Sequence, residues 1–310
     1  LSFINPYMVD HIEFSAGGFE ASYGDRMSSV LDIQYRRPDS FRLQSEASLM
    51  GGAVTVDGVN SNKRLSTVTG ARYRTNQLLL SSLDTDADFR PEYFDLQTYW
   101  RFKIDDQWTL NALGSYASNL YEVLPSTRST DFGSFQEALR LTVFFDGKER
   151  YTYRTVFGAL NAEQKVSDQL LLQYTFSAYQ SVEQEYFDVI GAYRLGELEL
   201  NLGSDDFGEV VQERGVGEFQ NFARNELDAI FFNLEHKGMY FFDRSTLSWG
   251  LKFQRDDIID RYKEWERIDS AGYNVPHNPS VSPPGGDPVE AWPSIELFEH
   301  FDSRASVQSG

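Results

Sequence analysis

Alternate aspartates are the first candidate for chemistry in this sequence. Asp84, Asp86 and Asp88 have the spacing that opens a calcium-binding loop. Such a loop needs glycine at its sixth position and a bidentate glutamate at its twelfth, and here those positions hold Phe89 and Asp95. We therefore interpret the aspartates as part of a solvated loop and predict no metal site.

Paired carboxylates are the second candidate, because two of them can act as acid and base in glycoside hydrolysis. The acidic residues concerned are Glu183, Glu185 and Asp188, followed by Asp205, Asp206 and Glu209. They fall in a polar stretch where no periodicity fixes one carboxylate relative to another. We predict that they are loop residues without a catalytic role.

The remaining reactive residue types give no site either. His11, His236, His277 and His300 lack a second histidine three to five residues away, so a zinc site is not expected. The chain has no cysteine, and it contains neither a Gly-x-Ser-x-Gly motif nor a phosphate-binding glycine loop. The sequence therefore predicts no enzyme and no cofactor.

Composition limits the partners. The chain has 310 residues, 15% of them aromatic, and a formal net charge of -19. A nucleic-acid partner is excluded, because binding a polyanion requires a basic face. No run of 18 apolar residues is present, so the sequence predicts no membrane helix.

Alternation with a period of two residues is the dominant pattern. In one stretch Phe94, Leu96, Trp100 and Phe102 alternate with charged or polar residues. The stretches 170–176 and 247–253 alternate in the same way. This pattern predicts antiparallel β-strands with one apolar and one polar face, hence an all-β fold.

Connection lengths discriminate between all-β architectures. We predict nine strands, at 41–50, 53–58, 64–74, 94–104, 108–118, 151–165, 169–182, 225–237 and 245–257, with a tight turn at Gly51-Gly52. Short turns alternate with long polar loops at 75–93, 118–150, 183–224 and 259–305. This alternation is typical of transmembrane β-barrels, which have short periplasmic turns and long extracellular loops.

The first 38 residues carry a different signal. Two short strands, 10–15 and 30–35, flank a glycine-rich stretch. This arrangement resembles the closing motif of the plug domain in TonB-dependent outer-membrane receptors. The matching residues are Glu13, Gly17, Gly18, Tyr23, Gly24, Arg26 and Asp32.

The resemblance implies a fold and a function. Residues 1–38 would be the C-terminal end of a plug, and 39–310 the first part of an antiparallel transmembrane β-barrel. The protein would be a Gram-negative outer-membrane receptor that imports a scarce solute, energised by the TonB complex through a segment absent from this sequence. Outer-membrane lipid is then an expected partner and a surface lipoprotein a candidate one. Ser28-Ser29 stands where siderophore receptors have two glycines, which argues against an iron–siderophore ligand.

Aromatic and basic residues add two further expectations. Aromatics near strand ends are expected to form the girdle at the membrane interfaces: Tyr93, Trp108, Tyr116, Tyr151, Tyr153, Phe241 and Phe242. The basic residues Arg26, Arg36 and Arg37 are expected to pair with carboxylates of the barrel wall such as Glu46 or Asp95.

Two alternatives remain open from the sequence. The first is a soluble all-β carbohydrate-binding module whose acidic, aromatic loops form the binding site. The second is a porin without a plug. Detergent dependence would distinguish the module from the receptor, and the residues preceding Leu1 would distinguish the porin.

Overall fold

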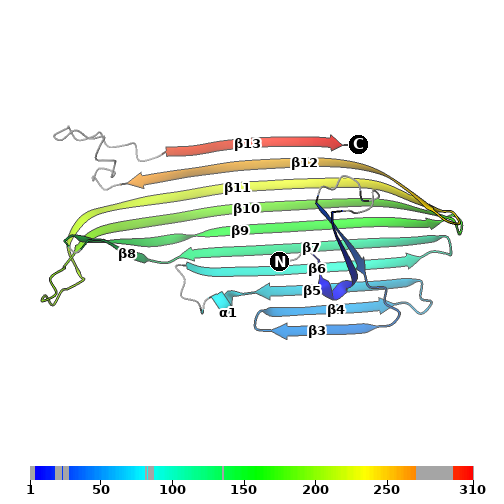
Figure 1. Cartoon of the computed structure of the whole chain (residues 1–310), viewed down its shortest axis with the longest axis horizontal. Coiled ribbons are helices and arrows are strands. Elements are labelled where there is room, and N and C mark those ends of the chain that lie inside the picture. The colour runs from blue at the N-terminus through cyan, green and yellow to red at the C-terminus, as the bar shows by residue number, and fades with distance from the viewer. Residues whose placement is uncertain are drawn as a thin grey trace.

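The computed structural model describes residues 4–17, 23, 28–80, 82, 87–134, 136–269 and 296–309. Within these ranges the chain is all-β, with one large antiparallel sheet and one two-stranded sheet (Figure 1). The described helices are the 3-10 turn η1 (Pro6–Met8) and α1 (Gln77–Leu80). No helix in the described ranges is long and apolar enough to cross a membrane.

The large sheet is built almost entirely from sequential hairpins. Its strands are β3 (Arg42–Ser48), β4 (Gly51–Val59), β5 (Leu65–Thr75), β6 (Ala87–Lys103), β7 (Trp108–Pro125), β8 (Arg128–Gly133), β9 (Ala138–Lys165), β10 (Leu170–Leu198), β11 (Val210–Phe241), β12 (Thr246–Asp269) and β13 (Glu296–Ser309). Each strand pairs with its sequence neighbour, except that β7 pairs with β9 and the short β8 lies beside β9. The described sheet is open, with β3 and β13 at its two edges.

All nine predicted strands are present, but several are much longer than predicted. Most of the predicted loops 118–150 and 183–224 belong to strands, as do 87–93 of the first loop and 259–269 and 296–305 of the last. The β10–β11 register, for example, runs from Leu170 opposite Tyr240 to Leu198 opposite Val210. The backbone ladder continues where apolar alternation fades, because its hydrogen bonds do not depend on which side chains are apolar. Residues 270–295 of the predicted loop 259–305 lie outside the described residues.

The turns that join β6 to β7 and β9 to β10 are short, as predicted. Asp105 Oδ1 accepts hydrogen bonds from the backbone N–H groups of Gln107 and Trp108, at 2.8 and 2.7 Å. Ser167 Oγ does the same for the N–H groups of Gln169 and Leu170. These side chains satisfy turn donors and fix the register of β6–β7 and β9–β10.

Gly51 directly follows the tight turn before β4. Strand β4 begins at Gly51 itself, which adopts a φ of +125°. A Cβ atom there would lie 2.1 Å from the carbonyl oxygen of Tyr73. The turn therefore falls on 49–50, two residues earlier than the predicted Gly51-Gly52 turn, and glycine is required where the chain leaves it.

The two faces of the large sheet differ in burial. One, which we call the apolar face, exposes large hydrophobic side chains on the strands from β3 to β12 other than the short β8, among them Leu43, Val54, Phe94, Leu96, Trp100, Leu160, Phe176, Leu234, Leu251 and Phe253. The other, the polar face, holds buried hydrophilic side chains, among them Thr55, Asp57, Arg72, Asp95 and Gln97. This distribution is the reverse of that in a water-soluble sheet.

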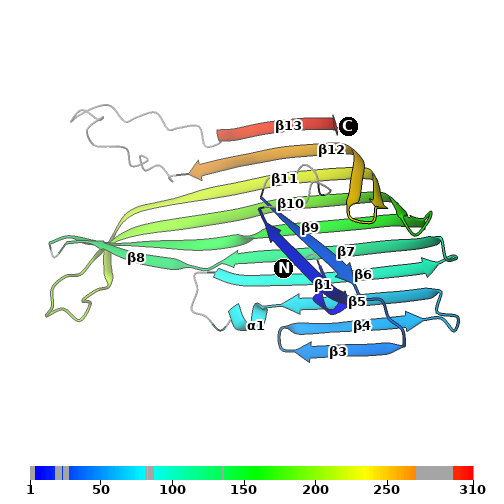
Figure 2. The ribbon, with the colours of Figure 1, turned by 45° about the vertical axis from the view of Figure 1, so that its right-hand side comes forward.

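The N-terminal segment, described at residues 4–17, 23 and 28–41, lies against the polar face. It contains η1 and the antiparallel pair β1 (Val9–Ala16) and β2 (Ser29–Tyr35), close to the two strands predicted there. Figure 2 shows β1 and β2 crossing the long strands at a steep angle, on one side of the sheet only. Asn5 and Met8 are fully buried in this contact.

Candidate functional site: contact of the N-terminal segment with the polar face

A buried ion pair forms the floor of the contact. Arg72 of β5 and Asp95 of β6 are directly opposite in the register, and Arg72 Nε donates to Asp95 Oδ1 over 3.0 Å. Tyr93 donates its hydroxyl hydrogen to Asp95 at 3.0 Å and accepts from Arg72 at 3.2 Å. Asp95 is fully buried and its carboxylate is satisfied by charged and neutral donors, which is the condition for burying an ion pair.

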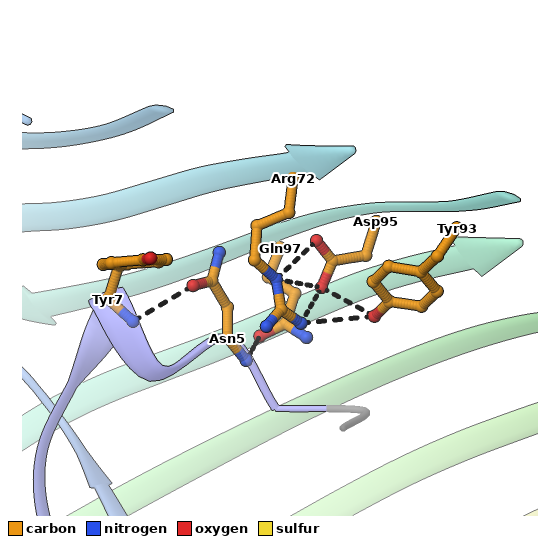
Figure 3. Close-up of polar contacts among 6 residues, drawn as sticks. All are labelled: Asn5, Tyr7, Arg72, Tyr93, Asp95 and Gln97. Atoms are coloured by element: carbon orange, nitrogen blue, oxygen red, sulfur yellow. Dashed lines mark hydrogen bonds and ion pairs between the residues drawn. The ribbon is translucent and has the colours of Figure 1, made fainter. Parts of the chain in front are cut away.

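Beside this pair, Asn5 attaches the N-terminal segment to the wall. The backbone N–H of Asn5 donates to Gln97 Oε1 at 3.2 Å, and Asn5 Oδ1 accepts from the N–H of Tyr7 at 3.1 Å (Figure 3). Asn5 thus caps η1 with its side chain while its backbone binds β6.

A glycine makes the close approach possible. A Cβ atom on Gly70 of β5 would lie 2.6 Å from Asn5 Nδ2 and 3.0 Å from Met8 Sδ. Gly70 is directly opposite Gln97 in the register, so the turn sits over a position without a side chain. The backbone conformation of Gly70 is ordinary, which makes close packing the reason for glycine here.

The end of β2 provides a second attachment. Arg36 Nη2 lies 2.9 Å from Asp57 Oδ1 of β4, and the two side chains are only 18% and 6% exposed. The rings of Tyr35 and Tyr99 stack with centroids 5.3 Å apart. Burial raises the pKa of Tyr35, and the negative charge of Asp95 raises it further, so Tyr35 stays neutral in this contact.

Tyr7 provides a third attachment near the edge of the sheet. Its hydroxyl donates to Glu46 of β3 and accepts from Arg74 of β5, the latter at 3.2 Å. Arg74 also forms an ion pair with Glu46 at 3.0 Å. The hydrogen bond to Glu46 raises the pKa of Tyr7, and burial and the negative charge of Glu46 act in the same direction.

These contacts correct the predicted ion pairs. Arg36 does bind a wall carboxylate, but its partner is Asp57, because the polar-face carboxylates Glu46 and Asp95 are bound by Arg74 and Arg72 within the sheet. Arg37 is exposed, and Arg26 lies outside the described residues.

The motif residues are placed as follows. Glu13 and Asp32 face each other in the β1–β2 register, and Tyr23 donates its hydroxyl hydrogen to Asp32 at 2.9 Å. Gly17 adopts a φ of +81° and its N–H donates to Ser28 O at 3.1 Å, which closes the hairpin. Lys237 of β11 lies over the Tyr23 ring at 5.9 Å. Gly18, Gly24 and Arg26 lie outside the described residues.

The predicted aromatic girdle divides between the two faces. Trp108 and Tyr116 share the apolar face, and Phe241 and Phe242 are exposed at a short turn. Tyr93, Tyr151 and Tyr153 lie on the polar face, where their hydroxyls bind Asp95, Glu149 and Glu185, and not on the face that would meet lipid. The strand period of two explains this, since residues at odd positions of β6 and β9 point away from Phe94 and Val156.

The sequence candidates for chemistry do not come together. Glu183 and Glu185 lie on the polar face, whereas Asp188 lies on the apolar face and pairs with Arg224 at 2.6 Å. Asp88 pairs with Arg90, while Asp84 and Asp86 lie outside the described residues. In the described ranges, no three His, Asp or Glu side chains are close enough to hold a metal ion.

The apolar face carries one open hollow of about 500 Å³. Its lining comes from six neighbouring strands and is almost wholly apolar: Leu65, Trp100, Phe102, Leu110, Ala112, Leu160, Ala162, Tyr174, Phe176 and Leu234, with Asn111, Asn161 and Thr175. The hollow is part of the exposed hydrophobic surface. Asn111, Asn161 and Thr175 occupy strand positions whose side chains belong to the polar face, so they do not orient a substrate in the hollow.

Comparisons with protein families, curated proteins and solved structures found no match for this chain. The geometry therefore carries the functional argument. It consists of a sheet with an uncovered apolar face and a polar face on which a separate segment is held by hydrogen bonds and ion pairs.

We predict that Gly70→Ala loosens the N-terminal segment. The new methyl group would overlap Asn5 and Met8, and overpacking costs about 1–3 kcal/mol. Tryptic cleavage after Arg36 in the full-length protein should accelerate by at least about fivefold. Gly114→Ala is the matched control, because its Cβ would make an ordinary 3.6 Å contact with Thr98. Equal cleavage rates for the two variants would contradict the proposed close packing.

A charge-swap experiment tests the Arg36–Asp57 pair. Arg36→Asp and Asp57→Arg should each expose the segment to protease, because each leaves a buried charge without its partner, at a cost of about 3–5 kcal/mol. The double variant should recover part of the protection. If the protease sensitivity of the double variant equals the sum of the effects of the two single substitutions, the two side chains do not interact.

Proposed function

We propose that the chain is part of an outer-membrane importer, in which the large sheet is a segment of a transmembrane β-barrel wall and the N-terminal segment is the end of a plug that closes it. The observation that carries this proposal is the inverted burial of the sheet. Large hydrophobic side chains face outward on strand after strand, while the N-terminal segment lies against part of the polar face. In this arrangement the apolar face would contact lipid, and the polar face would line a water-filled interior closed by the plug.

Dimensions support the proposal. The outward-facing apolar positions of β6 run from Phe94 to Phe102. The next one, Ile104, lies just after β6, beside a short turn. Ten residues at about 3.3 Å each, tilted by about 40°, span about 25 Å, the height of the apolar band of outer-membrane barrels. The long hairpins β9–β12 would then extend beyond the membrane on the side opposite the short turns.

Closure of the wall would require the edges β3 and β13 to pair, directly or through further strands, because unpaired backbone groups are not tolerated in lipid. The resemblance of residues 1–38 to a receptor plug supports energisation by the TonB complex. The solute would pass when the plug segment rearranges, and a surface lipoprotein remains a candidate partner.

Membrane insertion is tested by placing one positive charge on either face. Leu234→Arg puts it on the apolar face, where arginine costs about 2–4 kcal/mol at mid-bilayer. Gln254→Arg puts the same charge on the polar face, within reach of Asp256, which Gln254 already contacts. We expect Leu234→Arg to lower the yield of folded full-length protein in the outer membrane, and Gln254→Arg to leave it unchanged. Recovery of the wild-type protein from the soluble fraction without detergent would instead support the binding-module alternative.

Conductance distinguishes a plugged importer from a porin. The wild-type full-length protein in planar bilayers should conduct no ions, because the N-terminal segment covers the polar face. Combining Gly70→Leu with Asp57→Arg removes two of its attachments and should produce channel openings. Steady conductance by the wild-type protein would contradict the importer and support the porin.

A further inference from the structure

Beyond the apolar stretch, β6 to β12 continue as a second surface whose polar face has an unusual composition. Three successive register rows define it, and we call it the vestibule face. The first row is Tyr93, Asn119, Tyr153, Glu183, Leu227 and Asp260. The second is Pro91, Tyr121, Tyr151, Glu185 and Asn225, and the third is Phe89, Val123, Glu149, Phe187, Ala223 and Glu264.

Charge is segregated between the two sides of these strands. The vestibule face contains several carboxylates and, in the rows given above, no lysine or arginine. The basic residues of the same strand segments lie on the opposite side, and five of them have an acidic partner there: Arg90 with Asp88, Lys148 and Arg150 with Glu122, Arg224 with Asp188, and Arg261 with Glu226. Lys263 lies on that side too and is exposed. The charges of the opposite side are thus largely paired, whereas the rows of the vestibule face contain carboxylates and no basic residue.

Aromatic rings line the same face. Phe89 stacks with Tyr121, and Tyr121 contacts Tyr151, with ring centroids 6.1 Å apart in both pairs. The hydroxyls of Tyr151 and Tyr153 donate to Glu149 and Glu185, both at 2.8 Å. These bonds orient the rings and place no positive charge beside either carboxylate, because both donors are neutral hydroxyls.

We propose that the vestibule face binds an organic cation, the class of solute that the importer would admit. Aromatic rings attract ammonium and guanidinium groups, and uncompensated carboxylates concentrate cations at a surface. The same charges repel anionic solutes. A metal ion would need clustered ligands, which the described carboxylates do not provide, so a cation with distributed charge such as a polyamine fits better. A neutral sugar could use the rings but would leave the charge uncompensated.

This inference rests on the proposed function, because that function places the vestibule face toward the solute. The test is calorimetric titration of the full-length protein at physiological ionic strength. Spermidine is the cationic probe, maltose the neutral one and citrate the anionic one. We expect spermidine alone to bind. Glu183→Gln combined with Glu185→Gln should weaken its Kd by about tenfold, the effect of about 1.4 kcal/mol.

Two further variants separate specific binding from general attraction to an acidic protein. Glu122→Gln removes one carboxylate from the opposite side of β7 and should change the Kd for spermidine by less than about twofold. Tyr121→Leu should weaken binding of tetramethylammonium by roughly two- to fivefold through loss of a cation–π contact. Equal effects of Glu122→Gln and the double variant, or no effect of Tyr121→Leu, would overturn the proposal.

Tighter binding of maltose or citrate than of spermidine would also overturn it. Membrane fractionation of the same preparations makes the two failures distinguishable. A wild-type protein that is soluble without detergent contradicts the importer, whereas a membrane-inserted protein that does not bind spermidine contradicts only the organic cation.

Discussion

The structure depends on one constraint, the pairing of long antiparallel strands whose side chains alternate strictly between two faces. Once the backbone register is set, the position of a residue in its strand decides its side. On β6 this places Phe94 and Trp100 on the uncovered face and Asp95 on the covered one. An apolar surface spread over so many strands is unfavourable in water. A lipid environment removes that cost, which is why the proposed location follows from the alternation.

The polar face shows how the N-terminal segment can be held without a hydrophobic core. Its attachments are hydrogen bonds and ion pairs, supplemented by Met8 over Gly70 and by the Tyr35–Tyr99 stack. Buried ion pairs add little net stability, but they penalise alternative placements heavily. Such an interface specifies a position while keeping the cost of release moderate. These properties suit the proposed plug, which would have to close an interior and rearrange within it.

The sequence predicted the strands, the short turns and the β1–β2 hairpin, because alternation and turn residues are local signals. It did not predict that the stretches 118–150 and 183–224 are mostly strand, since backbone pairing persists there without clear apolar alternation. Tyr151 and Tyr153 were assigned to the girdle by their position near a strand end. Both are an odd number of residues away from Val156, however, and this alone places them on the opposite face of the strand. The Arg36–Asp57 pair was beyond prediction, because it depends on how a separate segment crosses the sheet.

The two sides of the extended hairpins differ in how their carboxylates are held, although the same strands form both sides. On the outward side five arginines and lysines have a nearby carboxylate, so the charges of that surface are largely paired. On the vestibule face tyrosine, serine and asparagine donors hold the carboxylates without neutralising them: Tyr151 holds Glu149, Ser181 holds Glu183, and Asn225 holds Glu264. Neutral donors preserve negative charge where arginine would cancel it. In these contacts the carboxylates of the vestibule face are held by neutral groups and not by cations, and this is the basis of the proposed selectivity for the sign of a solute's charge.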